Sequence, residues 1–374
     1  MTTRPTATVR AATHARLPHD AASELADALG HDLAGALLFV SPRYDRDALA
    51  SALAVAFPEV AVVGCTTSGQ IGPSGFQPDG ITAVGFPRSH FQIEAHAIEP
   101  LDAMQGAVTE VCEGVEASQP PRGWKTFGLL LVDGLSMAEE RLAAALYAGV
   151  GGIPIVGGSA GDDLAFEATH VYVDGCFRSN AAVLLIVHTP VAFTTIKVMH
   201  HVPTDRRLVI TAADPAQRLV REINGYPAAT AYAAAVGVAP EELCTETFSR
   251  HPVMLRLGNE HYIRSIQCVE ADGSMRFYCA IDKGLVLSVA KPSTPLDSLQ
   301  RAFERAQREI GQPSVVLGCD CILRRLELES LGLADEVGRF FADTRVVGFS
   351  TYGEQVDGVH VNQTFAGIAL GGMP

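Results

Sequence analysis

Three segments of this chain repeat one short pattern at wide intervals. Each is a run of β-branched residues, then a glycine, then hydroxyl residues, a second glycine and an acid or amide. The segments are residues 62–70 (VVGCTTSGQ), 155–163 (IVGGSAGDD) and 346–354 (VVGFSTYGE). Short β-branched runs are typical of buried strands, and a glycine directly after one indicates a bulge or a close approach of another backbone. We therefore expect three copies of one folding unit.

The sequence around each segment repeats as well. An apolar strand precedes each one, at residues 36–40, 127–132 and 314–317. A pattern of helical periodicity lies between strand and glycine, at 46–57, 138–148 and 326–341. Another helix comes before each first strand, at 20–29, 101–117 and 295–310, and hairpin signals follow each glycine segment.

The predicted order of elements in one unit is therefore helix–strand–helix–strand–hairpin. We predict it over about residues 6–98, 99–200 and 284–374. The stretch 201–283 differs, with a helical part at 215–236 and a β part at 253–280. Because each unit combines crossover connections with hairpins, the predicted fold class is α/β (mixed α+β), with repeated units forming mixed sheets covered by helices.

Composition narrows the function classes. The chain has 374 residues, of which 48% are hydrophobic and 19% charged, and this excludes a disordered protein. The net charge of −14 argues against binding to nucleic acid or to an acidic membrane surface, because both need basic patches. No apolar run approaches the ~20 residues of a membrane span, and the N-terminal residues do not read as a signal peptide. Eight scattered cysteines fit reduced thiols, so we expect a cytoplasmic protein.

The second glycine segment matches G-x-S-x-G, the nucleophile elbow of α/β-hydrolases, which needs the serine on a tight strand-to-helix turn. The residues after Ser159 read as a strand, so a structural turn is the preferred interpretation. A hydrolase with Ser159 or Cys65 as nucleophile is the alternative. Phosphate-binding glycine motifs are lacking, which argues against a nucleotide enzyme, and we expect no enzymatic activity.

A pair of cysteines ends the predicted strand at 314–317. Cys319 and Cys321 are two residues apart, so both thiols share one face of a strand, and Arg324 and Arg325 follow and could lower a thiol pKa. The two cysteines are redox candidates. The preferred interpretation is two small buried thiols, because a structural zinc site needs about four ligands.

The chain has 12 histidines, and an accessible imidazole can ligate haem iron. His200 and His201 follow a strand-like run, His188 ends a predicted strand, His251 precedes a proline, and His360 lies in VHVNQT. C-x-x-C-H is absent, which excludes covalent c-type haem.

Five motifs in this order resemble the FIST sensory proteins. They are VGCTT (63–67), PIVGGSAGDD (154–163), NGYPA (224–228), GFSTYGE (348–354) and HVNQT (360–364). The likeness spans about residues 30–370. It implies an N-terminal FIST domain over 30–224, holding the first two units, and a C-terminal FIST domain over 225–370.

Further residues resemble the nitric-oxide-sensing haemoprotein branch of that family (NosP). These are GCDCILRRLE (318–327), the His200-His201 pair and the run 348–365. The resemblance implies non-covalent haem b and a nitric oxide signal passed to a histidine kinase or a cyclic-di-GMP enzyme, as in a two-component system. The oligomeric state stays open, with a homodimer as one alternative. The ranked iron-ligand candidates are His201, His200, His360, His251 and His188, with a thiolate of Cys319 or Cys321 as a minor alternative.

The resemblance leaves a second reading open: a haem-free FIST module that binds a small metabolite such as an amino acid. Its pocket would use the hydroxyl and acid residues of the glycine segments. The candidates are Cys65, Thr66, Thr67, Ser159, Asp162, Asp163, Ser350, Thr351, Glu354 and Asn362.

Overall fold

The computed structural model describes residues 8–372. The chain divides into two compact units. The first unit comprises Met1–Lys197, Arg301–Val359 and Phe365–Pro374, and the second comprises Val198–Gln300 and His360–Thr364. Within the described residues, no helix combines the length and the apolar character needed to cross a membrane.

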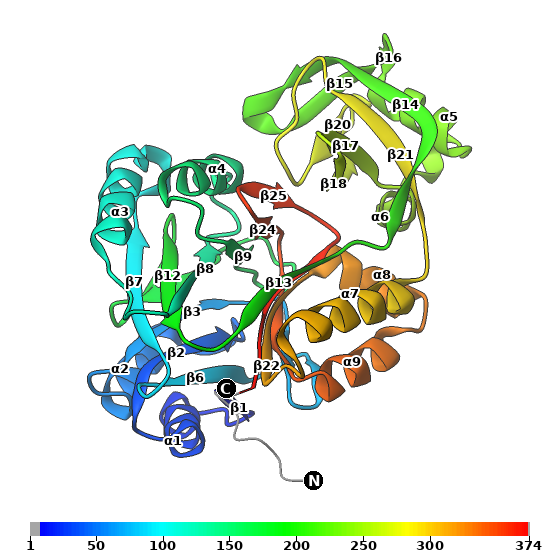
Figure 1. The fold of residues 1–374 in the computed structure, drawn as a ribbon. Helices are drawn as coiled ribbons and strands as arrows, with labels where there is room; N and C mark the ends of the chain where they lie inside the picture. Colours follow the sequence, from blue (N-terminus) through cyan, green and yellow to red (C-terminus); the bar gives the residue numbers. More distant parts are fainter. Residues whose placement is uncertain (1–7, 373–374) are drawn as a thin grey trace. The chain divides into compact units, whose positions relative to one another are not determined.

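The first unit contains the same six-stranded sheet three times (Figure 1). The first sheet has the order β1 (Val9–Thr13), β6 (Ile81–Pro87), β2 (Leu33–Val40), β3 (Ala61–Thr66), β10 (Val171–Val173), β11 (Cys176–Arg178). The second has the order β7 (Gln92–Ile98), β12 (Ala182–Thr189), β8 (Lys125–Val132), β9 (Ile155–Ser159), β24 (Glu354–Val356), β25 (Val359–Val361). The third has the order β13 (Phe193–Val198), β26 (Phe365–Leu370), β22 (Val315–Cys321), β23 (Val346–Thr351), β4 (Gln70–Gly72), β5 (Gly75–Gln77). The two central strands of each sheet are parallel, and the predicted fold class of repeated mixed sheets is confirmed.

Each repeat gives its hairpin to the sheet of another repeat. The first repeat's hairpin β4–β5 pairs with β23 of the third, with Ile71 opposite Gly348. The second repeat's hairpin β10–β11 pairs with β3 of the first, and β24 of the third repeat pairs with β9 of the second. This cyclic exchange joins all three repeats into one body.

Helices cover the sheets of the first unit. They are α1 (Pro18–Leu29), α2 (Arg46–Ala56), α3 (Gln105–Ala117), α4 (Glu139–Gly149), α7 (Pro295–Ile310), α8 (Ile322–Ser330) and α9 (Ala334–Asp343). In α1, Ala22, Leu25 and Leu29 are buried at helical spacing, as expected for an amphipathic helix. Asp45 caps α2 by accepting the backbone N–H of Ala48 at 2.9 Å.

Two predicted elements of the third repeat needed correction. The helix expected over 326–341 is two helices, α8 and α9, because Gly332 adopts a positive φ of 70° between them. The strand expected over 314–317 continues to Cys321, so both cysteines lie within β22.

The second unit is built on one eight-stranded sheet with the order β18-β17-β21-β14-β15-β20-β19, and β16 pairs with β15. Its strands are β14 (His201–Asp214), β15 (Leu219–Ile223), β16 (Tyr226–Pro227), β17 (Val253–Leu257), β18 (Glu260–Arg264), β19 (Ile266–Val269), β20 (Met275–Phe277) and β21 (Val286–Pro292). Two α-helices, α5 (Ala228–Val236) and α6 (Thr245–Arg250), accompany the sheet. The helical stretch expected over 215–236 was therefore only partly right. Its last nine residues form α5, whereas Asn224 and Gly225, both at positive φ, make a tight turn from β15 into β16.

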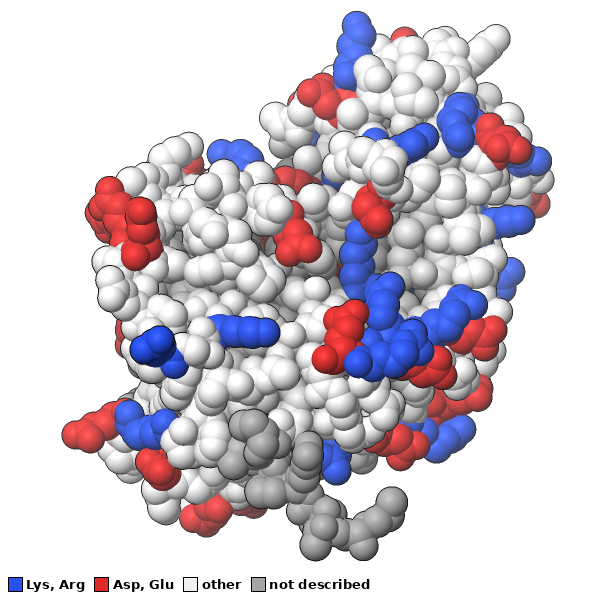
Figure 2. Space-filling view, in the orientation of Figure 1, with Lys and Arg blue, Asp and Glu red and all other residues white. Residues whose placement is uncertain are grey.

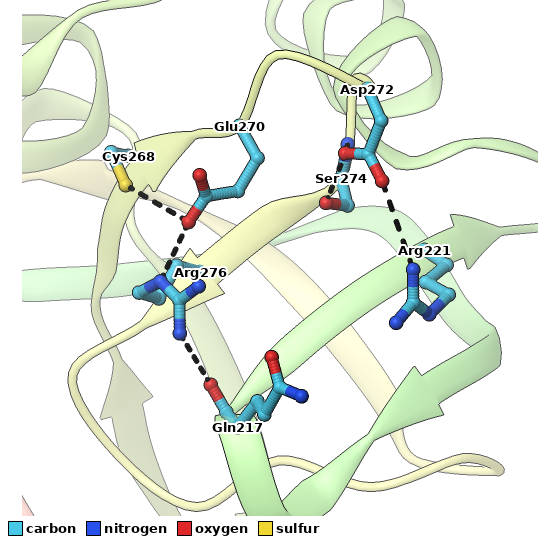
Figure 3. A network of polar contacts seen from close by, with 7 residues as sticks. All are labelled: Gln217, Arg221, Cys268, Glu270, Asp272, Ser274 and Arg276. Atoms are coloured by element: carbon cyan, nitrogen blue, oxygen red, sulfur yellow. Dashed lines mark hydrogen bonds and ion pairs between the residues drawn. The ribbon is translucent and has the colours of Figure 1, made fainter.

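A network of polar side chains connects neighbouring strands and turns near one edge of this sheet (Figure 3). Arg276 contacts Glu270 through Nε at 2.7 Å and donates through Nη1 to the carbonyl oxygen of Gln217 at 2.9 Å. Asp272 accepts the backbone N–H of Ser274 at 3.0 Å and lies 3.7 Å from Arg221. These groups are largely exposed, so the network orders the turn and contributes little stability. Figure 2 shows acidic and basic side chains interspersed on the face in view.

Candidate functional site

The three glycine segments meet inside the first unit through equivalent hydrogen bonds. The backbone N–H of Ser68 donates to the carbonyl oxygen of Ser350 at 3.1 Å. The backbone N–H of Gly161 donates to the carbonyl oxygen of Thr66 at 3.0 Å, and the backbone N–H of Tyr352 donates to the carbonyl oxygen of Ser159 at 3.1 Å. Each bond runs from one repeat to another, so the ring closes. The ring lies where the central parallel strands end, which is the usual location of ligand sites in sheets of this kind.

A repeated glycine permits this arrangement. A Cβ atom on Gly64 would lie 2.3 Å from the carbonyl oxygen of Leu38, and one on Gly157 would lie 2.0 Å from that of Leu130. On Gly348 it would lie 1.7 Å from the carbonyl oxygen of Gly318. The same backbone therefore approaches the same glycine in all three repeats, and only glycine fits.

Most predicted pocket hydroxyls form the framework around the ring. Thr66 Oγ1 accepts the backbone N–H of His170 at 3.0 Å, and Thr67 Oγ1 donates to the carbonyl oxygen of Val40 at 3.3 Å. Ser159 Oγ accepts Gln355 Nε2 at 2.9 Å, and Thr351 donates to Glu354. All of these residues are buried. The hydroxyls of Thr66 and Ser159 join one repeat to another, whereas those of Thr67 and Thr351 bond within their own repeats. None of the four residues lines a described cavity.

The loop after β9 is held by Asp162. Its carboxylate accepts the backbone N–H groups of Phe166 at 3.0 Å, Glu167 at 2.7 Å and Ala168 at 3.0 Å. It also accepts the hydroxyl of Tyr352, whose oxygen in turn accepts the N–H of Leu164 at 2.8 Å.

These bonds stabilise an unusual backbone. Asp163, Leu164 and Phe166 all have positive φ, at 55°, 66° and 54°. Such angles are rare for residues with side chains and persist only where surrounding contacts fix them. Here they turn Asp163 and Leu164 toward a cavity.

The cavity, which we call the three-loop cavity, has a volume of about 230 Å³. Its lining comes from all three repeats: Arg43, Ser68, Pro78, Asp163, Leu164, Ile322, Arg325, Leu326 and Glu329. Of the ten predicted pocket residues, Asp163 alone lines it.

Charges of both signs face the three-loop cavity. Arg325 donates through Nη1 to the carbonyl oxygen of Ser68 at 3.2 Å and contacts Glu329 through Nε at 3.0 Å. The backbone N–H of Asp163 donates to Ser68 Oγ at 3.2 Å. Partial burial raises the pKa of Asp163, while the positive charges of Arg43 and Arg325 oppose the rise. The cavity can therefore meet a carboxylate and an ammonium group of one small molecule.

A second, larger cavity of about 570 Å³ shares Arg43 with the first. It is also lined by His14, Arg16, Tyr44 and Asp79. Arg43 pairs with Asp79 at 3.0 Å, and burial together with Asp79 and Glu24 raises the pKa of Tyr44 to about 12. Arg43 therefore lines both cavities.

The comparison with protein families decides the identity. A family model of the FIST N domain matches residues 35–226, and a model of the FIST C domain matches residues 228–357. This chain belongs to the FIST family. It is a sensory signalling module. The three-loop cavity draws on both matched ranges, since Ser68 and Asp163 lie in the FIST N match and Arg325 in the FIST C match. A search of curated proteins found no match.

The FIST chain buries the cysteines that the sequence singled out. Cys65, Cys319 and Cys321 are at most 1% exposed. Burial raises the pKa of Cys65 and of Cys319 well above the usual value, and Glu354 and Asp320 add to the effect at Cys319. The expected lowering of a thiol pKa by the neighbouring arginines is wrong for Cys319, because Arg324 pairs instead with Asp320.

Neither nucleophile of the alternative hydrolase reading has the geometry for that role. Ser159 ends β9, and the next regular element is the strand β10, so no strand-to-helix elbow forms. Ser159 is fully buried, and its Oγ accepts a hydrogen bond from Gln355. Cys65 is fully buried with a raised pKa, which disfavours the thiolate.

Four candidate histidines lie in the second unit, and one lies in the first. His200, His201 and His360 are buried, and the rings of His200 and His201 lie 4.3 Å apart. His201 Nε2 lies 3.1 Å from the carbonyl oxygen of Ser249. His251 is half-buried, and its pKa is lowered, chiefly by burial. Asn362, also in this unit, accepts the backbone N–H of Ser265 at 3.5 Å.

Two of the five histidine candidates have ring nitrogens in contact with other protein groups. In His201, Nε2 is bonded to the carbonyl oxygen of Ser249. In the first unit, the ring nitrogens of His188 contact Ser118 at 3.0 Å and Thr126 at 2.8 Å. Neither the three-loop cavity nor its larger neighbour is lined by any of the five candidates. No step of the function proposed below passes through haem.

Several cavity residues escaped the sequence reading. Arg43 follows the first repeat's strand in Ser41-Pro42-Arg43, and no feature of that tripeptide indicates a site. Ser68 lies inside the repeated segment, and Arg325 was noticed only as a neighbour of cysteines. The signal that could have found them is their position, because each follows a parallel central strand.

Proposed function

We propose that this FIST protein senses a small zwitterion of amino-acid type, bound in the three-loop cavity. One observation carries the proposal: two guanidinium groups and two carboxylates line a cavity of about 230 Å³. That volume is below the ~300 Å³ at which drug-sized pockets begin, so the ligand is small.

The lining suggests how such a ligand binds. Its carboxylate would take the charge-assisted hydrogen bonds of Arg325 and Arg43. Its ammonium group would lie against Asp163, whose carboxylate interacts electrostatically with both Arg43 and Arg325. Leu164, Ile322 and Leu326 supply the apolar wall for a side chain.

Binding is proposed to change how the repeats meet, without catalysis. Ser68, Asp163 and Arg325 belong to different repeats and already contact one another through backbone and side chain. A ligand that bridges them would favour one arrangement of the three loops over another. The signal would then pass through the protein surface to a partner, and a histidine kinase or a cyclic-di-GMP enzyme remains the partner that the sequence resemblance implies.

Haem binding and nitric oxide sensing stay separate predictions from the sequence. If His201 ligated the iron through Nε2, that nitrogen would have to give up its bond to the carbonyl oxygen of Ser249. Their test is an absorption spectrum of protein produced with haem supplied. A Soret band that shifts with nitric oxide would support them, and colourless protein that takes up no haem would remove them.

A screen of the twenty amino acids by thermal denaturation tests the zwitterion proposal. A true ligand at one hundred times its Kd stabilises the folded state by about 2.7 kcal/mol. Arg325→Met and Asp163→Asn should each abolish the shift. Arg141→Met, an exposed arginine on α4, is the matched control and should leave it unchanged. A screen in which no amino acid raises the unfolding temperature contradicts the proposal.

A further inference from the structure

A fully buried ion pair lies in the third repeat. Asp320, near the end of β22, accepts Nη1 of Arg324, on α8, at 2.5 Å, and both side chains are 0% exposed. The pair is incompletely satisfied. Arg324 Nε, Arg324 Nη2 and Asp320 Oδ2 have no hydrogen-bond partner within the described residues, and neither has Ser350 Oγ.

These groups lie together. Asp320 and Ser350 are direct partners in the parallel register of β22 and β23, so their side chains share one face of the sheet. Ser350 is also 0% exposed. Arg324 is paired with Asp320, and Asp320 lies beside Ser350, so the three residues form one buried polar cluster at the end of β22.

The other repeats show that the fold does not need this pair. In the same register, Val40 lies opposite Thr66 in the first repeat, and Val132 lies opposite Ser159 in the second. Valine thus stands where the third repeat has Asp320. The hydroxyls of Thr66 and Ser159 have hydrogen-bond partners, whereas that of Ser350 has none within residues 8–372.

Burial of such a pair has no structural advantage over valine. A buried ion pair is commonly no more stabilising than well-packed apolar residues, and each unpaired buried polar group destabilises the fold. Buried polar atoms in native proteins nearly always bond to protein, ordered water or a ligand, so the free edge of Arg324 requires a partner of one of these kinds.

The chemistry of the free atoms defines that partner. Nε–H and Nη2–H are the two parallel donors with which arginine binds a carboxylate bidentately. The hydroxyl of Ser350 has one hydrogen, which it can donate either to the bound carboxylate or to Asp320 Oδ2.

We propose that Arg324, Asp320 and Ser350 form an internal binding site for a small carboxylate. The site is distinct from the three-loop cavity, whose lining from α8 is Ile322, Arg325, Leu326 and Glu329. Because Arg324 is fully enclosed, the carboxylate enters through local opening of the structure, and binding is slow.

Equilibrium dialysis of the full chain against radiolabelled acetate, after long incubation and at constant ionic strength in chloride, tests the site. The wild type should take up one acetate per chain. Arg324→Lys should weaken binding at least tenfold, because an ammonium group cannot replace the bidentate edge. Arg141→Met, at an exposed arginine on α4, should bind acetate like the wild type.

A second variant separates binding from folding. The double variant Asp320→Val/Arg324→Met restores the apolar residue of the other repeats and should fold and bind no acetate. Ser350→Ala keeps the ion pair and should weaken acetate binding severalfold. Absence of saturable uptake by the wild type overturns the proposal, and so does unchanged uptake by Arg324→Lys and the double variant.

Discussion

The backbone N–H of Ser68 donates to the carbonyl oxygen of Ser350 at 3.1 Å, across 282 residues of sequence between the first and third repeats. In return, the N–H of Ser350 donates to the carbonyl oxygen of Gly69 at 2.8 Å. Together with the equivalent bonds at Gly161 and Tyr352, this reciprocal pair joins the three repeats beside the three-loop cavity, which Ser68 also lines. The account of sensing rests on that junction.

Gly348→Ala should strongly destabilise the chain. The added methyl group would lie 1.7 Å from the carbonyl oxygen of Gly318, so two central strands must separate. Overpacking of this kind costs about 1–3 kcal/mol or more. The measurement is the urea midpoint of unfolding.

Gly106→Ala is the matched control for that experiment. Gly106 lies in α3 with no atom within 4 Å of an added Cβ, so alanine should be neutral or stabilise by up to about 1 kcal/mol. Equal effects of the two substitutions would contradict the close-approach explanation.

Tyr352→Phe should loosen the loop that carries Asp163. The variant loses the hydroxyl that donates to Asp162 and accepts the N–H of Leu164, at a cost of about 1–3 kcal/mol. Hydrogen exchange of residues 162–168 should become faster, while the exposed Tyr147→Phe should leave it unchanged. Protection equal to the wild type would show that the hydroxyl does not hold the loop.

Asp163 should make stability depend on acidity. Its pKa is raised in the folded state, chiefly by partial burial, so the folded protein binds this proton more tightly than the unfolded chain. The resulting stabilisation is complete below the unfolded pKa of about 3.9 and is lost as the pH rises through the folded pKa. Asp163→Asn should remove that part of the pH dependence, so its free energy of unfolding should gain on the wild type as the pH rises. The opposite trend would mean that the arginines dominate.

The cysteines should differ widely in reactivity. Cys176 and Cys244 are exposed, and hydrogen bonds from Thr247 lower the pKa of Cys244. Cys65 and Cys319 are buried with raised pKa values. Iodoacetamide should therefore label Cys244 first and reach Cys65 and Cys319 only after unfolding, as read by peptide mass spectrometry. Early labelling of Cys319 would revive the redox interpretation.

The repeat could be predicted from the sequence because the structure of each copy requires glycine at the same position. Gly64, Gly157 and Gly348 meet equivalent carbonyl oxygens, so the requirement is local and visible. The exchange of hairpins between repeats was not predictable in this way. A hairpin such as β4–β5 has the same alternation whichever sheet it joins, and nothing near Gln70 specifies β23 as its partner.

The candidate site was predicted only in part for a related reason. Hydroxyl residues at strand ends were expected to line a pocket, but most of them bond to other protein groups, as Thr66 does to the backbone N–H of His170. The cavity itself depends on Arg43 and Arg325, which come together only when three repeats assemble. In the second unit, the turn at Asn224 and Gly225 was a local signal that the helical reading of 215–236 overlooked.

Calorimetric titration of the best amino acid and of its two singly blocked forms tests the central claim most directly. The N-acetyl derivative lacks the ammonium charge, and the methyl ester lacks the carboxylate. If the three-loop cavity recognises both charges through Asp163 and the two arginines, each derivative should bind at least tenfold more weakly than the parent. A derivative that binds as tightly as the free amino acid would contradict recognition of a zwitterion in this cavity.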